Sequence, residues 1–467
     1  MCHPVHVSTI LESSREADLA FVVCPAVRVL TVPRPLIAPP PGQWAQGFDG
    51  DPTDHHPSHE HLVTGVHVTD QRHTGQGLLD LMVVPASRPF AQSERGLRVA
   101  VELAHRAGSR LLVLCSKGAQ AEEFPDRLLR RHPVPVMLVQ LDRMSVSRFL
   151  PTLETQSHPF ALESGYQAFR DVADKRNLAL VFARAAGWSH VLFLDDDVRL
   201  PKTDPASWWQ SFGYLSVANA LHNIWVGQHD VVGWTMTRFP DNSAVCHARR
   251  LVGLPQANFI GGGSLVVRVA DDTPFYPTIY NEDWLFLYPY LLRGGTQEHR
   301  KPVGAAGVIH QAPYDPFAPG RPESEERGDL FAEGLLASLG PGGDPQAVRE
   351  LSYWSEVVRG RESMVRDVQA QVPRAVEAGT LPSADARRVL GALDPVLQLH
   401  RLDRTQAQLA GRCVSYRRAW ERDLERWCAA FSQLDPRVAD GLLSSPATLF
   451  RGPARPWHFL TAGGHGG

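Results

Sequence analysis

The chain has 467 residues, of which 43% are hydrophobic and 21% are charged. This length exceeds the roughly 250 to 300 residues at which a single hydrophobic core stops growing, so more than one packing unit is expected. The composition excludes a globally disordered chain. A formal net charge of -3 lacks the basic surplus of nucleic-acid-binding proteins, so no nucleic-acid partner is expected.

The six cysteines are scattered without CxxC spacing, which favours neither a zinc ribbon nor a secreted disulfide framework. No run approaches the roughly 18 apolar residues of a membrane helix, and residues 1–14 lack the order of a signal peptide. Apart from Lys117, Lys175, Lys202 and Lys301, every cation is Arg, which suggests a GC-rich bacterial genome. We expect a cytoplasmic protein without an integral membrane segment.

Residues 1–77 are predicted to form an irregular N-terminal extension. One strand-like run, Leu19 to Val32, precedes a proline-rich segment and a polar, histidine-rich stretch. The sequence DHHPSHEH at 54–61 has the composition of a metal cluster, but it is interrupted by proline, and no helix places ligands at i and i+4. We expect a solvated loop there, with adventitious metal binding as the alternative.

From residue 78 to residue 335, short apolar runs alternate with amphipathic segments. The segments 93–107 and 166–186 carry apolar residues on one helical face. The runs between them have the length and branched side chains of buried parallel strands, and they are Leu79–Pro85, Leu111–Cys115, Val134–Leu141 and Val191–Leu194. We therefore predict an α/β, Rossmann-like core over residues 78–335.

Beyond residue 340 the apolar spacing becomes helical. Asp344-Pro345 has the form of a helix start. Two apolar and aromatic stripes follow, over 351–372, interrupted only at Arg361, and over 399–431. We predict an α-helical C-terminal region over 341–435, in which the stripes pair as a hairpin or form a homodimer seam. A tail over 436–467 completes the chain, and its last residues, 461–467, are expected to be disordered.

The strand-like run 190–194 leads directly into three acids, Asp195, Asp196 and Asp197. Like charges packed at a strand end repel one another unless a cation or hydrogen-bond donors offset them. The carboxyl ends of parallel strands are also where open α/β sheets bind ligands. The sequence therefore favours a divalent metal site here, with a solvated acidic turn as the alternative.

This arrangement resembles the metal-dependent GT-A glycosyltransferases, especially their family-2-like branch. The hallmark of that group is an apolar strand ending in Asp-any-Asp, and the segment KRNLA at 175–179 is similar to the Arg-Asn helix that usually precedes it. The resemblance covers residues 78–320. It implies a nucleotide-diphospho-sugar transferase fold, a nucleotide-sugar donor and Mn²⁺ or Mg²⁺ as cofactor.

The resemblance also implies roles for single residues. Asp195 and Asp196 would face the nucleotide, and Asp197, together with Asp195, would hold the metal on the diphosphate. Arg176 would lean toward the base or the diphosphate. Further donor contacts are expected from Pro85 and Ser87 at the first strand and from Gly262 and Gly263, which we expect in a glycine loop opening a strand.

One position departs from the family pattern. After the second strand the family usually carries an Asp that reads the nucleobase, whereas this chain has Cys115-Ser116-Lys117. Ser116 could hydrogen-bond a base but carries no charge. The sequence therefore leaves the nucleotide open.

A second acidic motif, Asn281-Glu282-Asp283-Trp284, stands where the family carries Glu-Asp before a helix. By resemblance, Asp283 would be the general base that takes the proton of the acceptor hydroxyl, and Glu282 would orient the acceptor. That geometry would invert the anomeric configuration, although retaining enzymes share the metal motif. Read alone, the two acids could instead be N-terminal helix residues favoured by the helix dipole.

His310 is the third predicted metal ligand. Several GT-A enzymes place a His after the last strand of the domain, and imidazole suits Mn²⁺. A merely hydrogen-bonded His is the alternative. The acceptor stays open among small molecules, glycans and peptides, and four tryptophans either shape its side of the site or belong to the core, namely Trp208, Trp209, Trp225 and Trp234.

Three other classes fit parts of the sequence. A haloacid-dehalogenase-type phosphatase also ends a strand with Asp-any-Asp, but it requires Thr or Val where this chain has Arg199. A nucleotidyltransferase would need a Gly-rich, Lys-bearing loop near the first strand. A catalytically inactive glycosyltransferase-like binding module is the alternative that is not an enzyme.

Overall fold

The computed structural model describes residues 59–66, 79–141, 146–163, 166–199, 213–237, 239, 242–294, 302–402, 406–445 and 447–452. The predicted strand-like run Leu19–Val32 and the last residues, 461–467, lie outside these ranges.

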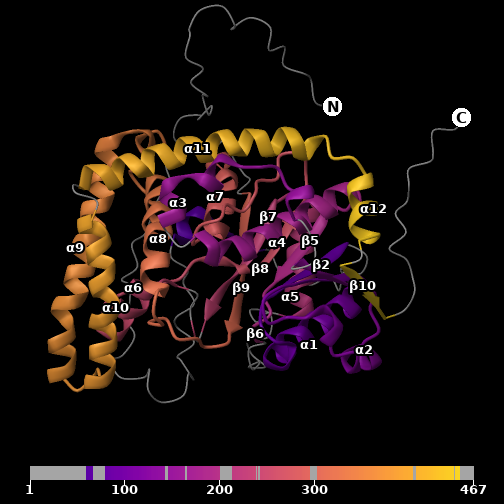
Figure 1. Cartoon of the computed structure of the whole chain (residues 1–467), viewed down its shortest axis with the longest axis horizontal. Coiled ribbons are helices and arrows are strands. Elements are labelled where there is room, and N and C mark those ends of the chain that lie inside the picture. The colour runs from indigo at the N-terminus through magenta and orange to yellow at the C-terminus, as the bar shows by residue number, and fades with distance from the viewer. Residues whose placement is uncertain are drawn as a thin grey trace, which may run out of the picture.

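The strands belong to one mixed sheet at the centre of the molecule (Figure 1). They are β1 (Thr64–Gly65), β2 (Leu81–Ala86), β3 (Arg110–Cys115), β4 (Val136–Gln140), β5 (His190–Leu194), β6 (Val198–Arg199), β7 (Val231–Thr237), β8 (Ile260–Arg268), β9 (Val303–Gln311) and β10 (Thr448–Arg451). Their order is β1-β9-β7-β8-β5-β2-β3-β4-β10, with β6 paired to β9.

The helices are α1 (Phe90–Ala107), α2 (Arg127–Arg131), α3 (Pro159–Glu163), α4 (Tyr166–Ala185), α5 (Tyr214–Trp225), α6 (Ala244–Leu251), α7 (Glu282–Arg293), α8 (Arg321–Ser338), α9 (Leu351–Glu377), α10 (Ser383–Leu402), α11 (Gln406–Ser432) and α12 (Arg437–Leu443). None of the helices in the described ranges is long and apolar enough to cross a membrane.

Most of the central strands run in one direction, and β8 is reversed among them. β4, β3, β2 and β5 run parallel, as the buried apolar runs predict. β8 lies antiparallel to both β5 and β7, and β9 then runs parallel to β7. The α/β, Rossmann-like core is confirmed, with the reversed strand β8 lying between β5 and β7.

Side chains of each central strand alternate between two apolar layers. In β2, Leu81 and Val83 join the core shared with α4, α7, α8 and α11, whereas Met82 and Val84 join the core shared with α1 and α5. Because both faces are covered, these strands are continuous apolar runs rather than alternating ones.

The C-terminal region is helical, as predicted, but it does not pack as a separate unit. Trp354 on α9 stacks on Phe331 of α8 with ring centroids 5.1 Å apart. Tyr416 and Trp420 on α11 belong to the same core as the sheet. α11 extends from the α9 and α10 side of the molecule to α12 (Figure 1). The predicted division at residues 335–341 therefore runs through a continuous core.

Several local expectations are corrected. The second predicted stripe begins within α10 and continues in α11, so it is two helices. α9 begins at Leu351 and not after Asp344, because Oδ1 of Asp344 accepts the N–H of Gln346 at 2.8 Å in a local turn and Glu350 is extended. Residues assigned to the tail form α12 and β10, and β10 pairs antiparallel with β4.

The end of the histidine-rich stretch is also not a solvated loop. Nε2 of His59 lies 3.0 Å from Oε2 of Glu333 on α8. Its ring meets Phe259 and Trp284 edge-to-face, with centroids 5.7 and 6.1 Å away. The described part of the N-terminal extension is therefore packed on the domain, and β1 adds to the sheet beside β9.

Arg361, which interrupts the apolar stripe of α9, forms a buried ion pair. Its Nε and Nη2 donate to Glu326 of α8 at 3.0 and 2.7 Å. Nε2 of His400 on α10 lies 2.8 Å from Oε1 of the same carboxylate. Burial alone would raise the pKa of Glu326, but Arg361 and His400 outweigh it and lower this pKa to about 2.

We predict that Glu326→Gln lowers the free energy of unfolding by roughly 3–5 kcal/mol at pH 7, because it removes one of the two carboxylates that compensate the buried Arg361, the other being Asp329. The depressed pKa means that the contribution of Glu326 is present above the usual pKa of Glu. The difference from wild type should therefore shrink as the pH falls from about 5 towards 2. Urea denaturation across this range measures it.

The control is Glu102→Gln, which removes only the exposed i,i+4 pair with Arg106 and should cost about 0–1 kcal/mol. Equal stability of the Glu326 and Glu102 variants at pH 7 would contradict the assignment of a stabilising buried pair.

Candidate active site

The two acidic motifs predicted from the sequence meet at one buried arginine. Arg176 of α4 donates from Nη1 to Oε1 of Glu282 at 2.6 Å and from Nη2 to Oδ1 of Asp195 at 3.0 Å. Only 2% of Arg176 is exposed. The carboxyl end of β5 and the start of α7 are thereby joined in one site.

The electrostatics of this group follow from its burial. Burial raises the pKa of Glu282, and neighbouring Asp283 raises it further, while Arg176 opposes both. Burial also raises the pKa of Asp195 against the effect of Arg176. Loss of either carboxylate would leave a buried guanidinium with one counter-charge, which is costly.

Asp283 is held by the backbone of two elements. Its Oδ2 accepts the N–H of Gly262 in β8 at 2.5 Å, and its Oδ1 accepts the N–H of Trp284 at 2.9 Å. Each carboxylate oxygen has a second lone pair, so the group keeps acceptor capacity in this fixed orientation. Asp283 as a whole is 9% exposed, so it lies at the margin of the core.

The glycines expected in a loop lie inside β8. A Cβ on Gly262 would stand 2.3 Å from Nη1 of Arg176, and one on Gly263 would stand 1.8 Å from Cε of Met236. The carbonyl of Gly263 accepts the N–H of Asp195 at 3.0 Å. The glycines are needed because strand, arginine and acids approach so closely.

We predict that Gly262→Ala lowers the free energy of unfolding by about 1–3 kcal/mol through overpacking against Arg176. Gly360→Ala is the matched control, because a Cβ there meets nothing within 4 Å. In a helix interior that substitution should stabilise by about 0.5–1 kcal/mol. Urea denaturation of both variants measures the difference, and equal effects would contradict the close approach.

The three consecutive acids point to different partners. Asp196 accepts the backbone N–H groups of Ser87 and Arg88 at 3.0 and 3.3 Å and pairs with the Arg88 guanidinium, so it anchors the turn after β2. Asp197 forms an ion pair with Nη2 of Arg88 at 3.0 Å and accepts a hydrogen bond from Nε2 of Gln311 at 3.2 Å. Arg88 and Gln311 are site residues that the sequence analysis missed.

The acids fit a divalent cation in charge and ligand type. Burial raises the pKa of Asp197 to about 6, with Asp195 and Asp196 adding to the effect and Arg88 opposing it. Oε1 of Gln311 is buried without a hydrogen-bond partner beside this carboxylate. Carboxylate and amide oxygens suit Mg²⁺ and Mn²⁺. In the described ranges, no three His, Cys, Asp or Glu side chains are already gathered as a metal cluster.

His310 is buried in β9 at 8% exposure, next to Gln311. Successive strand residues point to opposite sides, and Gln311 is the one that bonds Asp197. The metal role of His310 therefore stays a prediction.

The predicted donor residues Pro85, Ser87 and Ser116 lie at neighbouring strand ends. Pro85 is buried in β2, and the N–H of Ser116 donates to the carbonyl of Ala86 at 3.1 Å. Lys175, fully buried, donates from Nζ to the carbonyl of Ala86 at 2.8 Å and to Oγ of Ser87 at 2.8 Å. These contacts fix the turn that follows β2.

Asp171 brings a carboxylate to the same strand ends. Its Oδ2 accepts from Oγ of Ser87 at 2.9 Å and from Nζ of Lys175 at 3.0 Å. A carboxylate therefore lies at these strand ends, although none follows β3 directly. In the sequence, the i,i+4 spacing of Asp171 and Lys175 on a predicted helix was the signal that these two residues pair.

The tryptophans divide between core and surface. Trp234 is fully buried and donates from Nε1 to Oγ of Ser216 at 2.7 Å, so it belongs to the core. Trp225 is 63% exposed at the end of α5. Trp208 and Trp209 lie outside the described residues.

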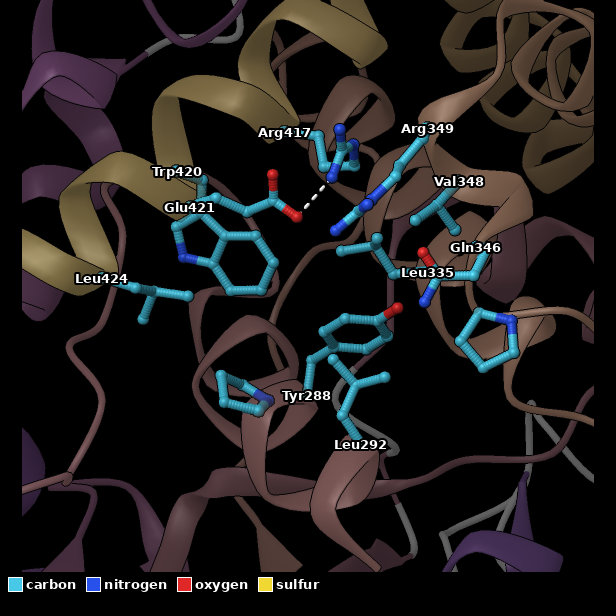
Figure 2. Close-up of a pocket in the computed structure, with 12 residues that line it drawn as sticks. Tyr288, Leu292, Leu335, Gln346, Val348, Arg349, Arg417, Trp420, Glu421 and Leu424 are labelled. Atoms are coloured by element: carbon cyan, nitrogen blue, oxygen red, sulfur yellow. Dashed lines mark hydrogen bonds and ion pairs between the residues drawn. The ribbon is translucent and has the colours of Figure 1, made fainter. Parts of the chain in front are cut away.

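A pocket between α7, α8 and α11 is separate from this site. Figure 2 shows Glu421 paired with Arg417, with Arg349, Trp420 and Tyr288 around them. Neither acidic motif lines this pocket. It contacts α7 at Tyr288 and beyond, whereas Glu282 and Asp283 are on the first turn of that helix.

No protein-family model and no curated protein matches the chain. Among solved structures, similarity is found to glucosyl-3-phosphoglycerate synthase from Mycobacterium tuberculosis in complex with Mn²⁺, UDP and phosphoglyceric acid. That match has 16% identity and a TM-score of 0.36, and it covers 60% of this chain and 86% of that chain.

Two further structures are similar. Mannosyltransferase PcManGT from Pyrobaculum calidifontis, in complex with GDP-Man and Mn²⁺, has 15% identity, a TM-score of 0.35, and coverage of 72% and 85% of the two chains. S. aureus TarS 1-349 has 13% identity, a TM-score of 0.32, and coverage of 74% and 91%.

Proposed function

We propose that this protein is a metal-dependent glycosyltransferase of the GT-A type, which moves a sugar, expected to be a hexose, from a nucleotide-diphosphate donor to an acceptor hydroxyl. The observation that supports it most is the convergence of Asp195 and Glu282 on Arg176 at the end of a parallel strand. Two acidic motifs that are far apart in the sequence thus meet at the carboxyl end of a parallel strand, where open α/β sheets bind ligands.

The donor half would be built around Asp195 and Asp197. Mn²⁺ or Mg²⁺, when bound, would supply a Lewis acid for the diphosphate leaving group. Asp197 and Asp195 would hold it, with Gln311 or His310 beside them. Arg88, whose side chain is 45% exposed, would exchange its contact with Asp197 for the negative charge of the diphosphate.

The acceptor half would be built around Asp283. An acceptor hydroxyl is a poor nucleophile at neutral pH, so a fixed carboxylate that removes its proton lowers the barrier. The two backbone hydrogen bonds of Asp283 orient this group, and Glu282 would orient the acceptor. Attack on the side opposite the leaving diphosphate would invert the anomeric configuration.

We further propose a cytoplasmic enzyme. Homodimerisation through the C-terminal helices stays a proposal that light scattering of the purified chain would test.

We expect Asp197→Asn to lose Mn²⁺ binding and sugar transfer, because it removes the charge that holds the cation. Electron paramagnetic resonance counts bound Mn²⁺ without substrate, and release of labelled sugar measures turnover. Asp126→Asn, at a 67% exposed side chain, is the control. Full turnover in excess EDTA, or in the Asp197 variant, would overturn the metal assignment.

The same Mn²⁺ titration distinguishes between Gln311 and His310 as the third residue that would hold the metal beside Asp195 and Asp197. We expect Gln311→Ala to weaken Mn²⁺ binding more than His310→Ala does, because Gln311 is the residue bonded to Asp197. The reverse order would favour the imidazole predicted from the sequence.

Asp283→Asn should lower kcat by roughly 100- to 10,000-fold, the usual worth of general-base catalysis, with donor affinity changed only a few-fold. The amide keeps the size of the side chain and one of its two acceptor oxygens. Calorimetry gives the donor Kd, and thermal unfolding reports the lost backbone hydrogen bond. Collapse of donor binding, or turnover within a few-fold of wild type, would show that Asp283 is not the base.

A further inference from the structure

The residue before the acidic pair has an unusual backbone conformation. Asn281 has φ 60° and ψ 35°, in the left-handed region. For residues other than glycine this region is unfavourable, although Asn tolerates it better than most. Residues held there by their surroundings cluster at functional sites.

The side chain of Asn281 does not cap helix α7. Asn at an N-cap normally accepts a backbone N–H of the first turn, but no such bond forms here. Instead, Nδ2 of Asn281 donates to Oδ1 of Asp329 on α8 at 2.9 Å. The start of α7 is therefore tied sideways to another helix.

Asp329 is the centre of a buried polar cluster. Its Oδ2 accepts from Oγ of Ser243, at the start of α6, at 2.7 Å and from Nη2 of Arg361 on α9 at 2.5 Å. Arg361 also holds Glu326, which contacts His400 of α10. Asp329 and Glu326 are each 2% exposed. The cluster thus connects α6, α8, α9 and α10 with Asn281.

Close backbone packing supports the same connection. A Cβ on Gly328 would stand 2.3 Å from the carbonyl oxygen of Tyr280. α8 therefore touches the chain directly before Asn281. A displacement of α8 would be transmitted to residues 280–283.

We infer that Asn281 and Asp329 are positioning residues, through which the helical C-terminal region holds Glu282 and Asp283 in register with Arg176. The inference rests on the proposed function for its catalytic consequence. The hydrogen bonds described above connect Asn281 and Asp329 to one another, to Ser243 and to Arg361, and not to Asp195 or Asp197. Their effect should appear in the rate of transfer, since a misplacement of about 1 Å can cost about 100-fold.

Asn281→Gly tests the tether. Glycine adopts φ 60° without strain, so it preserves the turn and removes only the side-chain bond to Asp329. Asp329→Asn removes the charge at the other end. We expect both variants to lower kcat by about 10- to 100-fold, with donor Kd within about 2-fold of wild type. Because both substitutions break the same connection, the kcat of the double variant should be no lower than that of Asp329→Asn.

Asp423→Asn is the matched control. Asp423 is a fully buried carboxylate on α11 that accepts the N–H groups of Glu154 and Thr155 at 2.8 and 2.7 Å. Its loss should destabilise the helical region without changing kcat at a temperature where the variant is folded. If Asp423→Asn lowered kcat as much as Asp329→Asn does, the effect of Asp329 would be one of general stability, and the positioning role would be contradicted.

Hydrogen exchange gives a readout that needs no sugar transfer. Both tether variants should speed exchange of the backbone N–H groups of residues 282–285, while residues 191–194 of β5 stay protected. Wild-type kcat and wild-type exchange in Asn281→Gly would overturn the inference. Faster exchange in a protein that transfers no sugar would retain the tether and refute the proposed function.

Discussion

A guanidinium taken out of water must be compensated by carboxylates, and Arg176 obtains its compensation from two separate parts of the chain. Desolvating an ion costs several kcal/mol even after relaxation, so Asp195 and Glu282 have to reach the same spot. This requirement sets the placement of α4, β5 and α7 against one another. It also explains Gly262, because a strand with a side chain at that position could not pass beside the arginine.

The helical C-terminal region obeys the same rule at a second arginine. Arg361 interrupts an otherwise apolar stripe, and it is buried only because Glu326 and Asp329 meet it. Between the two arginines lies Asn281, at the start of the helix that carries Glu282. The apolar core runs continuously from the sheet to α11. The sheet and the helical region thus share one apolar core, and each part also contains a buried arginine compensated by two carboxylates.

Much of the fold could be predicted because each signal was local. The parallel strands are continuous apolar runs, and the acids follow β5 directly, so both were visible in the sequence. The partnership of Arg176 with Glu282 spans residues distant in sequence, and no periodicity reports it. Only the resemblance to a family predicted that the two motifs belong to one site, and the fold then places Asp195 and Glu282 on the same arginine.

The missed features depend on tertiary contacts. Nothing in the sequence around Arg88 or Gln311 indicates a role in the site, because each is identified only by its contact with Asp197. The glycines were expected in a loop that opens a strand, and glycine inside a strand is unfavourable in isolation. Here the proximity of Arg176 and Met236 outweighs that preference. β10 was assigned to a tail because a four-residue strand at a sheet edge has almost no signature of its own.

The central claim is that the strand ends around Arg176 form a metal-assisted site for a nucleoside diphosphate. Isothermal titration calorimetry of the wild-type chain with UDP, GDP, ADP and dTDP, each with Mn²⁺ and again with EDTA, tests it most directly. We predict that at least one of the four binds in Mn²⁺ and loses at least about tenfold in affinity in EDTA. Binding of none of them, or binding that EDTA leaves unchanged, would contradict the account.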